Sequence, residues 1–265
     1  MQGLAGSRSL RVALLQHARV ILALMLRDIQ TRFGATYLGF LFGLILPLGH
    51  IGIVLGIYIL MGRRAPIGTD VTLFLASAIV PFVVWSYTHQ RLIQSFSQNW
   101  ALTAFPIVKF DDILAARCIV ELLNAVLVVA IVAAAFAVLG NDLFIADPMS
   151  LFYCLFLSYA LGVATGFVFG LLGMLAPIMM MVGYLTIPIY WLSSGVFFIP
   201  EALPEQARAA LAVIPLWHIV DFGRSAFFPS YLSSFPSLFY VHAVIVANIL
   251  FGFALQRFLR SSFRS

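Results

Sequence analysis

The chain alternates long apolar stretches with short polar segments. Residues 33–62 and 148–200 contain no Asp, Glu, Lys or Arg, and their apolar residues fall on every face of a helix. A helix needs about 20 such residues to cross a bilayer. The pattern therefore predicts an all-α polytopic membrane protein with six membrane-spanning helices, at Tyr37–Met61, Val71–Gln90, Ile113–Leu139, Met149–Leu175, Ile178–Ile199 and Pro236–Leu255.

The count of six depends on dividing the stretch 148–200. A single helix over these residues would be about 80 Å long, far beyond a hydrocarbon core of about 30 Å. Pro177 disfavours helical structure at Ala176, and Gly173 loosens the turn before it. We therefore expect the chain to turn back within residues 173–177.

Residues 8–32 follow a helical period ahead of the first span. Leu10, Leu14, Ile21 and Met25 share one face, and the arginines and glutamines lie on the other. This predicts an amphipathic helix along the cytoplasmic membrane interface. It is either a simple anchor or an element that contacts a partner or a gate.

Two other segments differ from the spans. Residues 95–112 are moderately polar, too polar to span a membrane and too short to form a domain, so we interpret them as a cytoplasmic docking loop. Residues 200–236 mix charged and apolar side chains, which predicts short re-entrant helices in the outer leaflet. Prolines at 204, 215 and 229 separate these helices. We expect residues 1–265 to form a single transmembrane domain.

Composition agrees with this interpretation. Of 265 residues, 63% are apolar and 9% are charged, against about 25% charged in a soluble domain. With both termini inside, eleven Lys and Arg residues lie on the cytoplasmic side and four outside, as the positive-inside rule favours. The placement of the charged residues relative to the membrane matters more than the net charge of +5, which does not imply nucleic-acid binding.

The sequence offers little catalytic chemistry. It has no Gly-x-x-x-x-Gly-Lys-Ser/Thr motif for ATP, and no metalloprotease, serine-hydrolase or dinucleotide motif. His50 is either a proton relay or a neutral packing residue, and Arg117 and Glu121 are spaced to pair on one helix face. A lipid- or sugar-modifying membrane enzyme is the remote alternative, for which His218 with Asp221 is the available pair.

The order of these elements resembles the type-2 ATP-binding-cassette exporter permeases, in particular the branch that exports capsular polysaccharide or O-antigen. The chain departs from the family pattern at Phe42, Leu46 and Ile214, which bears on the substrate more than on the family. The matching stretches are Arg27-Asp28-Ile29-Gln30-Thr31-Arg32-Phe33 with Leu38-Gly39 and Pro47; Asn99 to Leu102, Phe105-Pro106, Val108, Asp111, Ala116-Arg117 and Glu121; and Ser194 to Pro200 through Leu203-Pro204 to Pro215-Leu216, His218 and Arg224.

The resemblance implies a homodimer with two ATPase subunits that bind ATP and Mg, while this chain binds no cofactor. The cargo would be a lipid-linked polysaccharide, either an acidic capsular polymer or, alternatively, O-antigen, teichoic acid or a small drug. Periplasmic and outer-membrane export proteins are further partners that it suggests. The location would be the bacterial inner membrane.

The resemblance also assigns residues. It implies that residues 95–112 couple to the ATPase, that an inner gate receives substrate, and that aromatic rings line the translocation path; those rings could instead belong to an interfacial belt or the core. The coupling residues would be Phe105, Pro106, Val108, Lys109 and Asp111, the gate residues Arg27, Asp28 and Arg32, and the lining residues Tyr37, Trp85, Tyr190 and Trp191.

Overall fold

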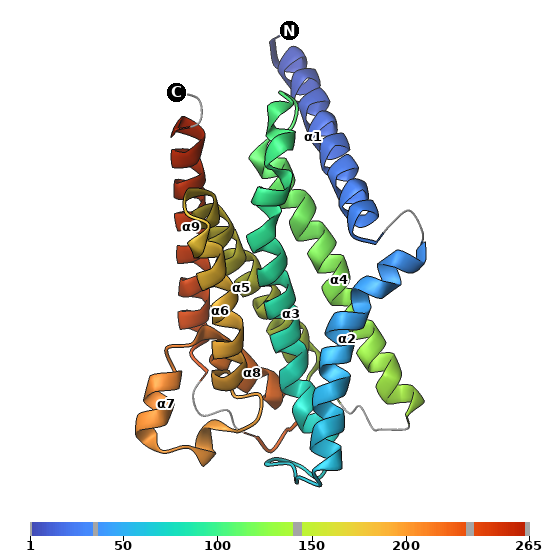
Figure 1. The fold of residues 1–265 in the computed structure, drawn as a ribbon, viewed down its shortest axis with the longest axis vertical. Helices are drawn as coiled ribbons and strands as arrows, with labels where there is room; N and C mark the ends of the chain where they lie inside the picture. Colours follow the sequence, from blue (N-terminus) through green and yellow to red (C-terminus); the bar gives the residue numbers. More distant parts are fainter. Residues whose placement is uncertain (1, 34–36, 140–144, 232–235, 263–265) are drawn as a thin grey trace.

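The computed structural model describes the backbone of residues 2–33, 37–139, 145–231 and 236–262, and the side chains of residues 14–31, 44–139, 145–231 and 236–260. Within these ranges every regular element is a helix, as predicted (Figure 1). The elements are α1 (Gln2–Phe33), α2 (Tyr37–Leu60), α3 (Val71–Asn99), the 3₁₀ helix η1 (Trp100–Ala104), α4 (Phe110–Val138), α5 (Pro148–Leu175), α6 (Ile178–Ser193), the 3₁₀ helix η2 (Pro200–Ala202), α7 (Glu205–Leu211), α8 (Pro215–Ser225) and α9 (Leu238–Ser262).

Four of these helices are long and apolar enough to cross a membrane: Val71–Ala104, Phe110–Val138, Pro148–Leu175 and Leu238–Arg260. Two shorter apolar helices, Leu44–Leu60 and Ile178–Ser193, run beside them. The polytopic helical class is confirmed, and the count of six spans stays a prediction.

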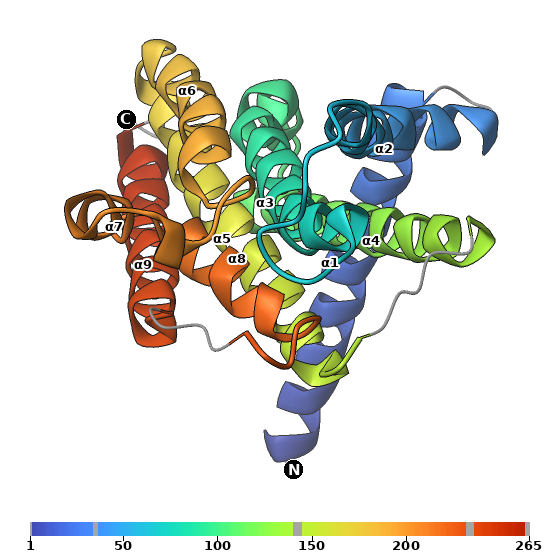
Figure 2. The same ribbon diagram turned by 90° about the horizontal axis from the view of Figure 1, so that it is seen from below.

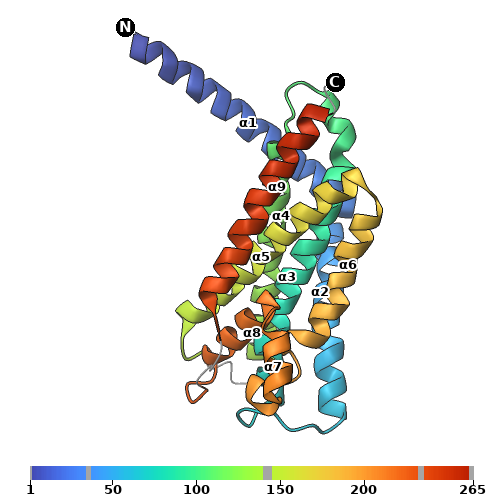
Figure 3. The ribbon, with the colours of Figure 1, turned by 90° about the vertical axis from the view of Figure 1, so that its left-hand side faces the viewer.

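The helices form one bundle with two distinct ends. The start of α1, the end of α9 and η1 lie at one end, which we call the terminal end, and α7 and α8 lie at the other, the α8 end (Figure 1). Seen from the α8 end, α8 lies against α3, α5 and α9 (Figure 2). The first part of α1 extends away from the bundle (Figure 3).

The closest packing in the core joins α3 to α5. A Cβ atom on Gly166 would lie 2.6 Å from the His89 carbonyl oxygen, and Gly162 and Gly170 are similarly close to α3 backbone oxygens. Glycines at this spacing let two helix backbones approach closely. These three glycines, spaced four residues apart, therefore pack two helices of the same chain against each other.

The structure confirms one predicted boundary and corrects two others. The turn at residues 173–177 is confirmed, since α5 ends at Leu175 and α6 begins at Ile178. The docking loop is shorter than residues 95–112, because α3 continues to Asn99 and buries that side chain. The span expected at Ile178–Ile199 ends at Ser193, and Gly195 then adopts a positive φ of 79°, which breaks the helix.

The described part of the segment predicted as short helices at 200–236 contains η2, α7 and α8, and Pro229 lies in a turn after α8. Pro204 is the N-cap residue of α7 and Pro215 is at the start of α8. Most of α8 is deeply buried, including Leu216 and Trp217, so α8 is part of the core of the bundle.

Candidate functional site

The link between α3 and α4 presents apolar side chains at the terminal end. Phe105 is 60% exposed and Ile107 is 55% exposed. Backbone hydrogen bonds from Phe105 to Leu102 (3.1 Å) and from Val108 to Phe105 (3.0 Å) hold the link in two tight turns. We call residues 100–109 the coupling loop, after the ATPase contact that the resemblance implies for this segment. Pro106 is exposed at its tip and Val108 is half-buried.

Lys109 closes the coupling loop and contacts α1. Its backbone N–H donates to Asp112 Oδ2 (2.9 Å), which caps the start of α4. His17 of α1 donates from Nδ1 to Asp112 Oδ1 (2.8 Å), so its Nε2 is free to accept a hydrogen bond from the Lys109 ammonium (3.2 Å). The coupling loop is thereby joined to the amphipathic helix.

Asp111, the last predicted coupling residue, faces α9. Its Oδ2 lies 2.7 Å from the Arg260 guanidinium, and its Oδ1 accepts from the Gln256 amide at 2.8 Å. Both carboxylate oxygens are therefore engaged within the chain. Phe105, Pro106 and Lys109 of the predicted contacts are exposed, as is Ile107, which the sequence analysis missed, whereas Val108 is half-buried.

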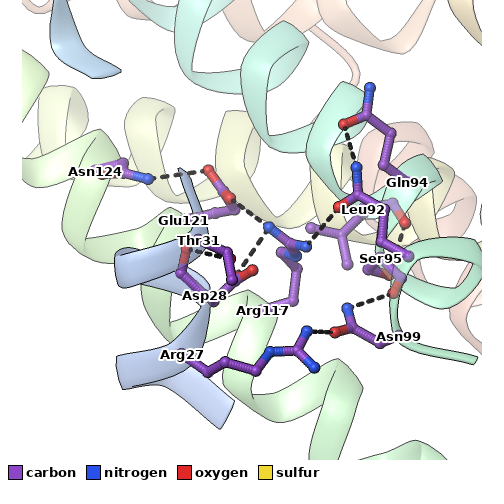
Figure 4. A network of polar contacts seen from close by, with 11 residues as sticks. Arg27, Asp28, Thr31, Leu92, Gln94, Ser95, Asn99, Arg117, Glu121 and Asn124 are labelled. Carbon is purple, nitrogen blue, oxygen red and sulfur yellow. Dashed lines mark hydrogen bonds and ion pairs between the residues drawn. The ribbon is translucent and has the colours of Figure 1, made fainter. Parts of the chain in front are cut away.

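A buried ion network joins α1 to α3 and α4 (Figure 4). The guanidinium of Arg117 lies 2.9 Å from Asp28 and 3.7 Å from Glu121, and it donates to Gln98 at 3.3 Å. The Arg117 side chain is only 2% exposed. A buried arginine requires this pairing, because an isolated charge in a low-dielectric interior is costly. The predicted pair of Arg117 and Glu121 is found, and Asp28 is the nearer partner.

Two of the residues predicted for the inner gate, Arg27 and Asp28, contribute to the contacts between α1 and the helices α3 and α4. Arg27 donates to the Asn99 side chain at the end of α3, and the Asn99 amide donates to the Ser95 carbonyl at 2.6 Å. Arg27 and Asp28 also line a hollow between α1 and α3. The Arg32 side chain lies outside the described residues. The side of α1 expected to face water thus supplies contacts to the bundle.

Leucines on another side of α1 are uncovered in the single chain. Leu15, Leu22 and Leu26 are each more than half exposed. Because a helix repeats every 3.6 residues, their spacing puts them on one stripe. This stripe has the character of a membrane-interface helix.

The predicted path aromatics separate into buried and accessible rings. Trp85 is 1% exposed, because Tyr190 stacks over it at a centroid distance of 4.6 Å. The Trp85 ring is therefore covered within the single chain, and its role as a lining residue stays a prediction. Tyr190 and Trp191 are half-buried on α6, and Trp191 packs against His50 of α2 at 4.7 Å. The Tyr37 side chain lies outside the described residues.

His89 is a buried polar centre that the sequence analysis did not single out. Its Nε2 donates to the Gly183 carbonyl at 3.0 Å, and its Nδ1 lies 2.8 Å from the Thr165 hydroxyl. It thereby links α3, α5 and α6. A polar side chain in an apolar stretch carries no partner information in the sequence, which is why it was missed.

Arg224 on α8 holds the end of α6 in place. It is fully buried and donates to the carbonyls of Phe198 (2.9 Å), Val196 (3.2 Å) and Gly195, with its guanidinium 4.5 Å from the centroid of the Phe74 ring. Burial lowers the pKa of Arg224 to about 10, so it stays charged at neutral pH.

The two residues considered for enzymatic chemistry have hydrogen-bond partners near the α8 end. His218 donates to the Ala212 carbonyl (2.8 Å) and accepts from the Ser237 N–H (3.2 Å), while Asp221 accepts from the Tyr231 hydroxyl. Among the described residues, no group of three His, Cys, Asp or Glu side chains is placed to hold a metal ion.

Comparison with known proteins gives relatives over most of the chain. No family model matches it. It is 30% identical over 236 residues to the polysialic acid transport protein KpsM of Escherichia coli. The aligned residues make up 89% of this chain and 91% of the relative. It is 25% identical to the capsule polysaccharide export inner-membrane protein CtrC of Neisseria meningitidis (89% of each chain) and 24% identical to BexB of Haemophilus influenzae, which has the same description (90% of each). The chain belongs to the capsule polysaccharide export inner-membrane proteins, the polysaccharide-export branch of the type-2 ATP-binding-cassette exporter permeases.

Proposed function

We propose that this chain is the membrane subunit of an ATP-driven exporter that moves a lipid-linked, acidic capsular polysaccharide across the bacterial inner membrane. The observation that carries the proposal is the similarity, over nearly nine-tenths of the chain, to a protein named for polysialic acid transport. Polysialic acid carries one carboxylate per sugar, so an acidic polymer is the cargo that this relative supports.

The coupling loop is the proposed contact with a separate ATPase subunit. Phe105 and Ile107 are exposed on this loop, and adjacent exposed apolar side chains of this size indicate a surface that a partner covers. The chain has no phosphate-binding loop of its own, so ATP and Mg would bind to the partner. Lys109 adds a positive charge beside these apolar residues, which suits a partner groove with an acidic rim.

A homodimer is the proposed assembly, with α2 at the contact between copies. A Cβ atom on Gly49, Gly52 or Gly56 would meet nothing within 4 Å, whereas the α5 glycines are tightly packed. Ile53, beside these glycines, is 65% exposed. The uncovered glycine stripe and the adjacent apolar side chains support close approach of a second helix. Gly39 and Gly43, which have the same spacing, lie outside the described side chains.

The proposed topology has six spans with both termini in the cytoplasm. The start of α1, the coupling loop and the end of α9 share the terminal end, as an even number of spans requires (Figure 1). The arginine distribution supports a cytoplasmic terminal end. Residues 200–236 would then lie at the periplasmic side, where further export proteins could receive the polymer.

Native mass spectrometry of the complex purified in mild detergent tests this assembly. We expect two copies of this chain with two copies of a P-loop ATPase. A chain that purifies alone, or only with lipid-synthesis enzymes, would contradict the exporter and favour a membrane enzyme.

A further inference from the structure

The two residues that follow the coupling loop are fixed to the end of α9. Asp111 bonds to Arg260 and Gln256, as described above, and Gln256 is only 3% exposed. The Arg260 guanidinium also lies 5.6 Å from the ring centroid of Phe110. Both oxygens of the Asp111 carboxylate bond to side chains of α9. Residues 110 and 111 are therefore held in a defined position relative to the end of α9.

An apolar layer reinforces this attachment. The Phe110 ring packs against Phe96 of α3 (6.0 Å), which packs against Phe167 of α5 (5.8 Å), which packs against Phe253 of α9 (5.3 Å). Gly252 allows the approach, since a Cβ atom there would lie 2.4 Å from the Phe167 ring. Displacement of Phe110 relative to α9 would disrupt this layer.

The other end of α9 is attached to the segment at the α8 end. The Tyr240 hydroxyl donates to the Val213 carbonyl (2.6 Å), and the Ser237 N–H just before the helix donates to His218 of α8 (3.2 Å). Between these contacts, α9 runs uninterrupted from Leu238 to Ser262 and contains no proline. At 1.5 Å per residue, it spans about 37 Å.

We propose that α9 is a transmission helix, in which Arg260 and Gln256 are positioning residues that pass displacement of the coupling loop, through Asp111, to the α7–α8 segment. The proposal rests on the proposed function, in which an ATPase moves the loop. Packed helices shift as rigid bodies between discrete arrangements, so a helix fixed at both ends carries motion from one to the other.

The test uses the full chain in complex with its ATPase, in liposomes, with a bimane label at Val213→Cys. Val213 is 69% exposed, and the Tyr240 bond is to its backbone, so the label leaves this contact in place. The chain without this substitution gives the background from the two native cysteines. Arg260→Gln breaks the link, and Arg257→Gln is the matched control, because Arg257 is exposed on the same turn.

We expect ATP to change the bimane emission in the parent chain and in Arg257→Gln. Arg260→Gln should keep the ATPase subunit and its hydrolysis but lose this change, and the exchange Asp111→Arg with Arg260→Asp should restore it. If Arg260→Gln does not reach the membrane, Asp111→Ala, which leaves α9 intact, replaces it.

An ATP-dependent change that persists in Arg260→Gln, or an exchange that restores nothing, would overturn the transmission role alone. Failure of any ATPase to co-purify with the parent chain would overturn the proposed function and this proposal together. The two failures are therefore distinguished by the purification step, before any fluorescence is measured.

Discussion

The carboxylate of Asp28 lies 2.9 Å from the guanidinium of Arg117, and this buried contact fastens α1 to α4. Glu121 lies 3.7 Å from the same guanidinium nitrogen. The arginine is thus shared between a carboxylate on its own helix and one on α1. Movement of α1 away from the bundle would leave Arg117 paired with Glu121.

This sharing predicts unequal costs for the two partners. Arg117→Met should destabilise the chain by about 3–5 kcal/mol, because it leaves buried carboxylates without their cation. Asp28→Asn should cost less, since Glu121 still neutralises the arginine. Thermal unfolding in detergent would measure both, with Arg19→Met at an exposed position of α1 as control. Equal stability of Arg117→Met and the parent chain would contradict a structural role for the network.

The packing of α3 on α5 predicts a contrast between two glycines. Gly166→Ala should destabilise the chain by about 1–3 kcal/mol, because the new methyl group overlaps His89 and Leu92 of α3. Gly52→Ala has open space, and alanine favours a helix over glycine by about 1 kcal/mol. Its thermal stability as a single chain should be unchanged or raised. Equal losses at both sites would refute the assigned packing.

The same open glycine predicts an effect on assembly. Gly52→Leu should weaken the homodimer, because the bulky side chain occupies the space left for a second copy of α2. Cross-linking in the membrane and native mass spectrometry would report a shift from dimer to monomer. An undiminished dimer would place the contact between copies on another helix.

The coupling loop predicts a loss of function without a loss of folding. Phe105→Glu, Ile107→Glu and Lys109→Glu should each abolish ATP-dependent export, because each puts a carboxylate on the surface proposed to meet the ATPase. Expression and membrane insertion should equal those of the parent chain. Arg64→Glu, an exposed charge change at the α8 end, is the control. Unchanged export in all three loop variants would remove the loop as the coupling element.

Arg224 predicts a local defect at the α8 end. Arg224→Gln should loosen residues 194–199, because the guanidinium donates to three carbonyls there and an amide cannot reach all of them. Limited proteolysis should then cleave this turn faster than in the parent chain. A cleavage rate equal to that of the parent would show that the turn is held by other contacts.

Much of the architecture follows from local chemistry that the sequence exposes. The turn at Pro177, the helix starts at Pro204 and Pro215 and the Arg117 and Glu121 pair depend on neighbours within a few residues. These features are set by proline geometry and helical spacing, and both can be recognised in the amino-acid sequence alone.

The contacts that were missed join residues far apart in the chain. Asp28 meets Arg117, and Asp111 meets Arg260, only after the helices have packed. Aromatic rings suit both a lining and a core, so the sequence did not show that Trp85 stacks with Tyr190 of α6. Helix orientation, which hydropathy does not encode, decides each of these cases.

The most direct test of the exporter is transport into inside-out membrane vesicles that contain this chain and its ATPase. A lipid-linked acidic capsular polymer and a neutral lipid-linked O-antigen, both labelled, are supplied outside with or without ATP. We expect ATP-dependent accumulation of the acidic polymer in the lumen, and we expect it to be lost when the ATPase subunit is omitted. Accumulation that does not require ATP, or that occurs only with the neutral polymer, would contradict it.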